Sequence, residues 1–453
     1  MDMEFRNSKL ELDLKCHAPI IHFQPEEEGA TLRASEVKPK FDRYLIKKVP
    51  SLKKRFKNQS LAYKMKFIDN SPSIIYKSKE NKDQFDKRTN NNEGNFELYF
   101  ARDGKRRVET NPTMIITCFD IELQNLIIDH IKNFFIVTNF GAAQGKGYGS
   151  FTVNDKEQDK QDYQSNIEAV LKEEFGLKTL YKMDFRQQCS KLGFSKRIKV
   201  IFENIEQFYK IIKSGYNYKG KYARSALFMY MHDKEKNLFK IDIGNEKAAL
   251  KDKIIEKPFG TRPYHLNKQT HNEKYVRALL GLSSFLSFTD IRKNMKKEEK
   301  DISVNIAIMH ESNKNEENIE RFPSPVTFKV INDIVYIIPK QGWYKYILNK
   351  KFKFKYKVSK KIPRSWTNGI EYKKFLISKP KTKKKEFIRI RKEEYAKFIE
   401  KMDKKLKRER LYLTTPEEFD LLNFLDFAVQ YYNKENSNGY LHNVDILYKI
   451  EKS

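Results

Sequence analysis

The sequence predicts an α+β protein of several domains with a basic extension at its C-terminal end. Segments with alternating apolar residues, typical of strands, are interspersed with segments whose apolar residues recur every three or four positions, typical of helices. The 453 residues are enough for two or three domains. Positive charge is concentrated late in the chain: between Lys345 and Arg410, 26 Lys or Arg stand against 7 Asp or Glu, a net of +19.

The first predicted domain spans residues 1–154. Its strands are predicted near the start of 7–23 and over 61–69, 95–101, 114–120 and 150–153. Two helices are predicted, over 35–46 with apolar residues four apart, and over 120–135, where Asp120 is suited to cap the first turn. The order of strand, helix, two or three strands, helix and strand is the split βαβ pattern of a ferredoxin-like, RRM-like domain.

A polar segment without apolar periodicity, 154–166, predicts a linker, taken as 155–174, to a second α+β domain over 175–344. Strands are expected there over 180–187, 197–203 and 303–309, with a hairpin about Asn332–Asp333, and helices over 203–215, 220–233 and 274–288. The remaining residues, 345–453, form the basic region, which ends in a helix after Thr415. Tandem ferredoxin-like (RRM-like) domains with a basic C-terminal extension are therefore the predicted architecture.

The composition restricts the possible function classes. A net charge of +30 favours a polyanionic partner, above all a nucleic acid, over a lysine-biased proteome or a membrane lipid surface. The chain is too rich in aromatic residues to be disordered, and its three cysteines lie too far apart for a thiolate zinc site or a disulfide framework. We expect no transmembrane helix and no signal peptide, and hence a cytoplasmic protein.

The segment NFGAAQGKGYGSFTV, residues 139–153, is the strongest local motif. Four glycines between a helix and a strand let the backbone approach phosphates closely and expose its N–H groups. Lys146 adds a positive charge, and Tyr148 adds an aromatic face. The order of helix, loop and strand differs from that of nucleotide-binding loops. A tight structural connector remains the alternative interpretation.

GKGYGSF after an amphipathic helix resembles the glycine-rich loop of the RAMP superfamily, the repeat-associated proteins of CRISPR effector complexes. TLRASEVKPKFDRYL (31–45) and RFPSPVTFKVI (321–331) are similar to further segments of this family, in particular of Cmr-type two-domain subunits. The resemblance implies an antiviral ribonucleoprotein subunit that holds single-stranded RNA on tandem RRM-like domains, together with other RAMP-type subunits. Matched positions that could contact RNA are Arg33, Ser35, Lys38, Gly145, Lys146, Gly147, Tyr148 and Gly149.

The segment KFKFKYKV (351–358) predicts a strand with lysines on one face and apolar residues on the other. We call Lys351, Lys353, Lys355 and Lys357 the lysine row. It favours phosphate binding. The alternative is an edge strand that lysines protect from aggregation.

Catalysis remains an open question at this level. The eight histidines form no metal-binding motif, so the sequence predicts neither a metal site nor a cofactor. The resemblance implies two possible activities. A metal-independent endoribonuclease that processes CRISPR-type RNA would need a general base, for which His17, His22 and Tyr44 are weak candidates, whereas a subunit that cuts target RNA would use a loop aspartate such as Asp69, Asp83 or Asp86. A scaffold that binds an acidic protein is the alternative of a different class. A non-catalytic RNA-binding subunit is the favoured reading.

Overall fold

The structure is a computed structural model that describes residues 4–21, 32–56, 60–69, 73–76, 107–154, 161–218, 221–239, 243–245, 272–282, 286–288, 304–312, 322–360, 372–378, 385–391, 411–437 and 450–452. The chain folds into two compact units. The first unit contains Met1–Ser225, Pro325–Gln341 and Leu421–Ser453, and the second contains Ala226–Ser324 and Gly342–Asp420. The chain therefore leaves the first unit twice and returns to it twice.

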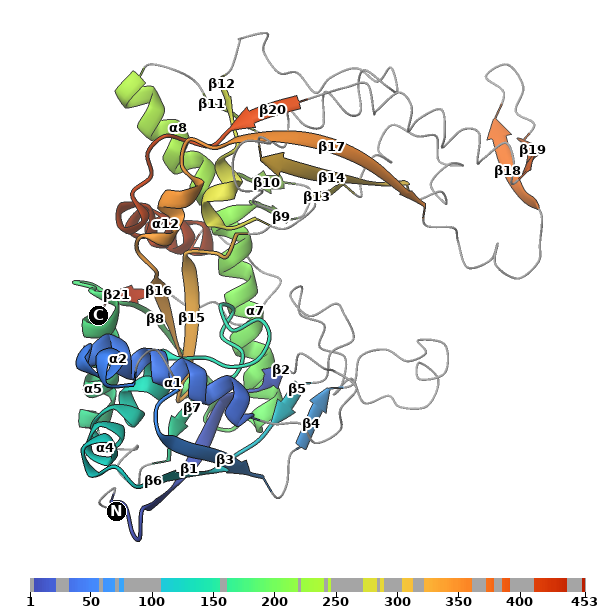
Figure 1. Ribbon diagram of the computed structural model, residues 1–453. Coiled ribbons are helices and arrows are strands. Elements are labelled where there is room, and N and C mark those ends of the chain that lie inside the picture. Colours follow the sequence, from blue (N-terminus) through green and yellow to red (C-terminus); the bar gives the residue numbers. More distant parts are fainter. Residues whose placement is uncertain are drawn as a thin grey trace. The chain divides into compact units, whose positions relative to one another are not determined.

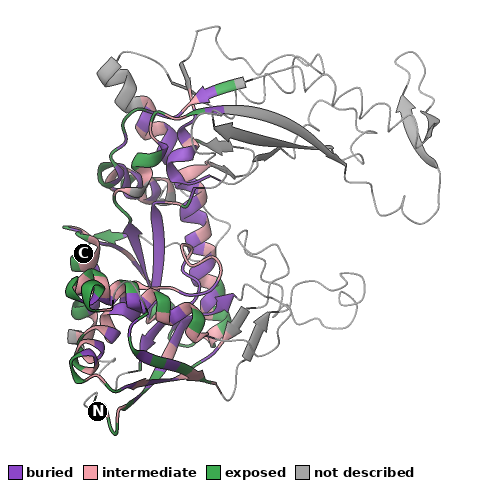
Figure 2. Cartoon of the chain, in the orientation of Figure 1, coloured by how far each residue is buried: buried purple, intermediate pink, exposed green. Residues whose placement is uncertain are grey.

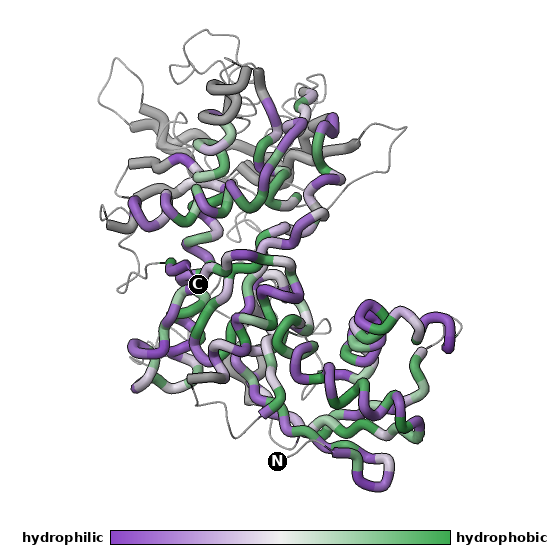
Figure 3. Tube along the Cα trace, turned by 90° about the vertical axis from the view of Figure 1, so that its left-hand side faces the viewer, coloured by the Kyte–Doolittle hydropathy of each residue, from purple (hydrophilic) through white to green (hydrophobic). Residues whose placement is uncertain are grey.

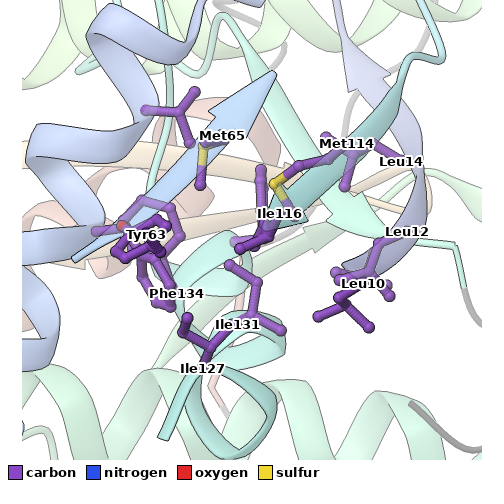
Figure 4. Packing of buried hydrophobic residues seen from close by; sticks show 14 of the residues in the cluster. Leu10, Leu12, Leu14, Tyr63, Met65, Met114, Ile116, Ile127, Ile131 and Phe134 are labelled. Atoms are coloured by element: carbon purple, nitrogen blue, oxygen red, sulfur yellow. The ribbon is translucent and has the colours of Figure 1, made fainter. Parts of the chain in front are cut away.

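The first unit begins with a four-stranded antiparallel sheet in the order β3-β6-β1-β7 (Figure 1). Its strands are β1 (Lys9–Ala18), β3 (Tyr63–Ile68), β6 (Thr113–Cys118) and β7 (Ser150–Val153). Helices α1 (Ala34–Lys48) and α4 (Ile121–Val137) share one apolar core with this sheet. The alternation predicted for β1 is confirmed, because Leu10, Leu12 and Leu14 are buried in that core (Figure 4).

Helix α4 forms where the apolar spacing predicted it. The Asp120 carboxylate accepts a hydrogen bond from the backbone N–H of Leu123 over 3.1 Å and so caps the first turn. Ile127, Ile131 and Phe134 follow along the buried face. Hydrophilic and hydrophobic residues alternate along the helices of the chain trace, as expected of helices that cover a sheet on one side (Figure 3).

A second four-stranded antiparallel sheet of the first unit has the order β15-β16-β8-β21. Its strands are β8 (Tyr181–Asp184), β15 (Val326–Ile331), β16 (Ile334–Pro339) and β21 (Glu451–Lys452). The predicted hairpin is confirmed, with positive φ at both Asn332 and Asp333 as a two-residue turn requires. Strands β15 and β16 are buried along their whole length (Figure 2).

Helices cover both faces of this second sheet, which explains why β16 is buried along its whole length. On one face, Phe208 of α7 (Phe194–Lys213) contacts Phe328 of β15 and Tyr432 of α12 (Leu421–Ser437). On the other face, α5 (Gln161–Phe175) packs with β16 in a separate core. The predicted linker 155–174 therefore contains most of a helix, whose apolar residues Ile167 and Leu171 are fully buried.

One expected strand is wrong. Residues 197–203 form the first half of α7 and not a strand. Ile198, Ile201, Phe202 and Ile205 follow helical spacing and are all buried, so the apolar face runs on without a break into the helix predicted over 203–215. Reading the two halves separately concealed the 20-residue helix.

The second unit is organised on a six-stranded sheet in the order β11-β12-β20-β17-β14-β13. Its strands are β11 (Ile243–Asn245), β12 (Asn272–Lys274), β13 (Leu286–Phe288), β14 (Val304–Ser312), β17 (Lys351–Lys360) and β20 (Leu411–Thr414). A separate hairpin pairs β18 (Tyr372–Ser378) with β19 (Lys385–Arg391). The expected helices over 220–233 and 274–288 are wrong in part. Residues 221–223 form a strand before α8 (Ala226–Phe239), and 274–288 contains only the short 3-10 helix η2 (Val276–Leu280), followed by β13.

The smaller elements are α2 (Ser51–Arg55), α6 (Arg186–Cys189), η5 (Trp343–Ile347), β2 (Ile20–Ile21), β4 (Ser73–Tyr76), β5 (Arg107–Glu109), β9 (Tyr216–Tyr218) and β10 (Lys221–Ala223). The α+β class is confirmed, with antiparallel sheets in the first unit and a six-stranded sheet in the second unit whose pairs are antiparallel except for β11–β12 and β12–β20. The predicted boundaries at 154, 174 and 344 differ from the division into units, since residues 325–341 and 421–453 belong with the first unit. The predicted basic region 345–453 is thus shared between the units, and its final helix begins at Leu421. The strand expected over 95–101 lies outside the described residues.

Candidate nucleic-acid interface

The glycine loop, residues 139–149, connects α4 to β7 and is closed tightly on itself. The backbone N–H of Phe140 donates to the carbonyl of Gly149 over 2.9 Å. Gly149 has φ +67, and a Cβ at this position would lie 1.9 Å from the Phe140 carbonyl oxygen. Gly147 has φ +94, and its Cβ would lie 3.2 Å from Cγ2 of Val330. Both positions therefore require glycine for reasons internal to the fold.

The same loop covers the free edge of the second sheet. The N–H of Phe328 in β15 donates to the Gly145 carbonyl over 3.3 Å, and the Phe328 carbonyl accepts from Nδ2 of Asn139 over 2.9 Å. Ser150 Oγ donates to the Val330 carbonyl over 2.5 Å. An unpaired strand edge is a site for unwanted pairing, and the loop satisfies two of the backbone groups that β15 presents there, while Ser150 of β7 satisfies a third. The alternative reading of the loop as a structural connector is supported for these residues.

Lys146 and Tyr148 point into the protein. Tyr148 has no exposed surface, and its ring stacks on Phe202 of α7 with centroids 4.1 Å apart. The Lys146 ammonium is buried over the ring of Tyr209, 2.8 Å from its centroid. Burial, and secondarily the charge of Lys213, lowers the pKa of Lys146 well below its ordinary value. The phosphate contact and the stacking face predicted for these two side chains are not available in this structure.

Lys38 is also engaged internally. Its ammonium donates to Asp42 Oδ2 over 2.9 Å, to Ser60 Oγ over 2.5 Å and to the Leu61 carbonyl over 3.0 Å, and it lies over the ring of Tyr63. Asp42 is itself buried and accepts from the Tyr63 hydroxyl. This network fixes α1 to β3, so Lys38 supports the fold and does not extend into solvent.

At the start of α1, Arg33 occupies the N-cap position and is partly exposed, and Ser35 is exposed. One turn on, two residues that the sequence analysis missed join this helix to the glycine loop. Lys40 donates to Glu36 over 2.7 Å, to the Asn139 carbonyl over 3.1 Å and to Gln144 Oε1 over 3.0 Å. Glu36 also accepts from the loop, through the Gly141 N–H at 2.8 Å. The signal for this pair in the sequence was the spacing of four residues between the acidic Glu36 and the basic Lys40, which brings the two side chains together on a helix.

A buried lysine, Lys329 of β15, was not anticipated either. Its ammonium donates to the Phe135 and Thr138 carbonyls, each over 2.8 Å, and to the Phe151 carbonyl at 3.4 Å. Phe135 and Thr138 lie at the C-terminal end of α4, where a positive charge is favourable and carbonyls lack helical partners. Burial lowers the pKa of Lys329 well below its ordinary value. Strand β15 thus supplies the cap of a helix that belongs to the first sheet.

His17 is a structural residue in this protein. It lies where the register of β1 shifts against β7, and its side chain is buried. Its Nδ1 accepts from the Asn332 N–H over 3.2 Å. The proton of the neutral ring therefore sits on Nε2, which donates to Thr152 Oγ1 over 2.8 Å. Burial, reinforced by Lys15, Lys329 and Arg197, lowers the pKa of His17 well below its ordinary value.

The other two candidates for general acid–base chemistry add little support. The Tyr44 hydroxyl donates to Glu174 over 2.6 Å, and burial together with this carboxylate raises the pKa of Tyr44. His22 lies outside the described residues. Within the described part of the chain, His, Cys, Asp and Glu side chains form no group of three that could hold a metal ion. The helices among the same residues include none long and apolar enough to cross a membrane.

The basic segment contains the strand on which the lysine row is predicted. Strand β17 forms as predicted, pairing with β14 on one side and β20 on the other. At its start, Lys351 is exposed, whereas Phe352 is fully buried against Tyr275, with ring centroids 5.5 Å apart. The predicted alternation is confirmed for these two residues. The other lysines of the row occupy alternate positions along the same strand.

Comparison with known proteins identifies the family. The family model described as the Cmr1 N-terminal domain matches residues 7–216, and that of the Cmr1 C-terminal domain matches residues 222–451. Among solved structures, the apo crystal structure of Cmr1 from Pyrococcus furiosus is similar to the chain at 10% sequence identity and a TM-score of 0.29, over 90% of this chain and 99% of that one. A search of the curated proteins found no match.

Proposed function

The chain belongs to the Cmr1 family, and from this premise we propose that it is a non-catalytic subunit of a CRISPR-type ribonucleoprotein that binds single-stranded RNA. Family membership confirms the resemblance to Cmr-type RAMP proteins and supports a place in a Cmr complex, with other RAMP-type subunits as partners. The proposal places this complex in the cytoplasm.

The proposed fold is a pair of ferredoxin-like domains within the first unit. Numbered along the chain, the strands of each four-stranded sheet run in the spatial order second, third, first, fourth, and all neighbours are antiparallel. In the first sheet α1 follows the first strand and α4 precedes the last, and in the second sheet α7 follows the first strand and α12 precedes the last. In the second domain, the chain of the second unit interrupts this order twice, which supports two insertions into one ferredoxin-like domain.

The observation that carries the RNA proposal is the charge of residues 345–410, a net of +19, combined with a strand that begins with exposed Lys351 and buried Phe352. A strand anchored on one face can present cations to a phosphate backbone from the other. In addition to the lysine row, Arg33, Ser35 and Gly145 remain proposed RNA contacts. We assign Lys38, Lys146, Gly147, Tyr148 and Gly149 to holding the fold.

The buried position of His17 and the Glu174 partner of Tyr44 support a non-catalytic role over a metal-independent endoribonuclease. An acidic protein partner could also bind the lysine row, but phosphate binding has a quantitative signature. Each phosphate contact on a single strand contributes about −0.7 to the slope of log affinity against log salt.

Binding titrations of the full chain against two unrelated single-stranded RNAs at several salt concentrations test the proposal. Changing Lys351, Lys353, Lys355 and Lys357 to Gln should flatten the salt slope by about 2 to 3 units and weaken both RNAs alike. A matched variant changes four exposed lysines of the first unit, Lys53, Lys54, Lys64 and Lys66, to Gln and should leave the slope near that of the wild type. Equal effects of the two variants would show that only total charge matters. Absence of RNA binding, with capture of an acidic protein instead, would refute the proposed function.

A further inference from the structure

An exposed aromatic residue lies beside the first cation of the lysine row. Tyr412 of β20 is 42% exposed, whereas Leu413, the next residue, is 2% exposed and packs inward. The Lys351 ammonium lies 5.1 Å from the centroid of the Tyr412 ring, within the range of a cation–π interaction. The charged and aromatic groups thus contact one another at the surface of the second unit.

The strand register places this pair on the proposed phosphate-binding face. Tyr412 is directly opposite Lys353, and Thr414 is directly opposite Lys351. Residues directly opposite one another in an antiparallel pair share a face of the sheet. On the other face, Phe352 and Leu413 are opposite each other and both buried. The sheet therefore has an apolar face that anchors it and a face where Tyr412 stands among positions occupied by lysines.

We propose that Tyr412 is a base-stacking residue for single-stranded RNA, with Lys351 binding the adjoining phosphate. This inference rests on the proposed function and names a contact within it. A nucleotide carries a planar base beside an anionic phosphate, which matches an aromatic ring beside an ammonium. The interaction with Lys351 restricts the ring, so less side-chain freedom is lost when a base stacks on it. Bases within a duplex are already stacked and paired, so this site selects an unpaired strand.

Substitutions at Tyr412 separate stacking from charge. With a short oligouridylate as the probe, Tyr412→Ala should weaken binding about fivefold or more, the lower limit for the loss of one base–aromatic contact. Tyr412→Phe should bind like the wild type, because the ring and not the hydroxyl makes the contact. Tyr412→Leu keeps apolar bulk at the position and should bind as weakly as Tyr412→Ala. Tyr346→Ala is the matched control, since Tyr346 is 74% exposed in η5, outside the sheet, and should have no effect.

Two further measurements distinguish this contact from phosphate binding. Tyr412→Ala should leave the salt slope unchanged, because the ring neutralises no phosphate, whereas Lys351→Gln should flatten the slope by about 0.7. An abasic oligonucleotide of the same length should bind wild type and Tyr412→Ala equally. Equal weakening of the abasic strand, or an unchanged affinity of Tyr412→Ala for oligouridylate, overturns the stacking assignment while the RNA-binding function stands. Failure of the wild type to bind either strand overturns both.

Discussion

Substitution of Gly149 by alanine tests whether the close backbone approach inside the glycine loop stabilises the first unit. The new Cβ would lie 1.9 Å from the Phe140 carbonyl oxygen and 2.7 Å from its carbon, so the backbone itself would have to move. That movement would disturb the Phe140–Gly149 hydrogen bond and the cover that the loop gives to β15.

The magnitude follows from comparison with two other glycines. Gly176 has a similar φ of +62, but its Cβ would meet nothing within 4 Å, so Gly176→Ala carries only the cost of the left-handed conformation, about 1–2 kcal/mol. Gly145→Ala would bring ordinary contact with Thr327 at 3.6 Å and should change stability by less than about 1 kcal/mol. Gly149→Ala adds a backbone clash to the conformational cost and should lose about 4 kcal/mol or more.

Denaturant unfolding of the three variants, followed by circular dichroism, measures this ranking. A Gly149→Ala chain that fails to fold beside a folded Gly176→Ala chain gives the same ranking. If Gly149→Ala loses no more stability than Gly176→Ala, the close approach does not exist in the folded protein, and the requirement for glycine at position 149 is refuted.

Two buried basic residues give the remaining predictions. Lys329→Met keeps a side chain of similar length but leaves the Phe135 and Thr138 carbonyls without their donor. The free energy of unfolding should therefore fall by about 2–4 kcal/mol in denaturant titrations. An unchanged unfolding midpoint would show that the ammonium contributes nothing to stability. Because the pKa of His17 is lowered in the folded protein, the unfolded chain binds more protons than the folded chain as the pH falls below 6.5. The stability that neutral His17 contributes is therefore present above pH 6.5 and declines as the pH falls. His17→Gln should remove this decline as the pH falls below 6.5, and a plot of stability against pH with the same slope in both proteins would contradict the assignment.

Local patterns predicted much of the first unit because its elements are specified by neighbouring residues. The alternation of Leu10, Leu12 and Leu14 and the cap at Asp120 depend on a few consecutive positions, and both are observed. The strand expected over 197–203 was wrong because two helical turns of Ile and Phe also satisfy a strand pattern when read alone.

The direction in which the side chains of the glycine loop point depends on residues far away in the sequence, which a local sequence pattern does not include. Ser150 and Val330 are 180 positions apart, yet they lie together where the glycine loop meets β15. The sequence of the loop indicated contacts of lysine and tyrosine with a ligand, but Tyr209 and Phe202 of helix α7 receive the side chains of Lys146 and Tyr148 in the protein interior. A lone lysine in the apolar segment VTFKVI gave no indication of the carbonyls that Lys329 would meet.

The interrupted second sheet has a consequence for the order in which the protein acquires structure during synthesis. The first sheet is complete once Val153 has emerged, and its contacts join strands from one continuous segment. The second sheet needs β8, the hairpin of β15 and β16, and β21 at Glu451–Lys452, so it is complete only after Lys452 has emerged. Strand β8 lacks its neighbour β16 until Pro339 has emerged and its neighbour β21 until Lys452 has emerged, so the growing chain exposes apolar surface in the meantime.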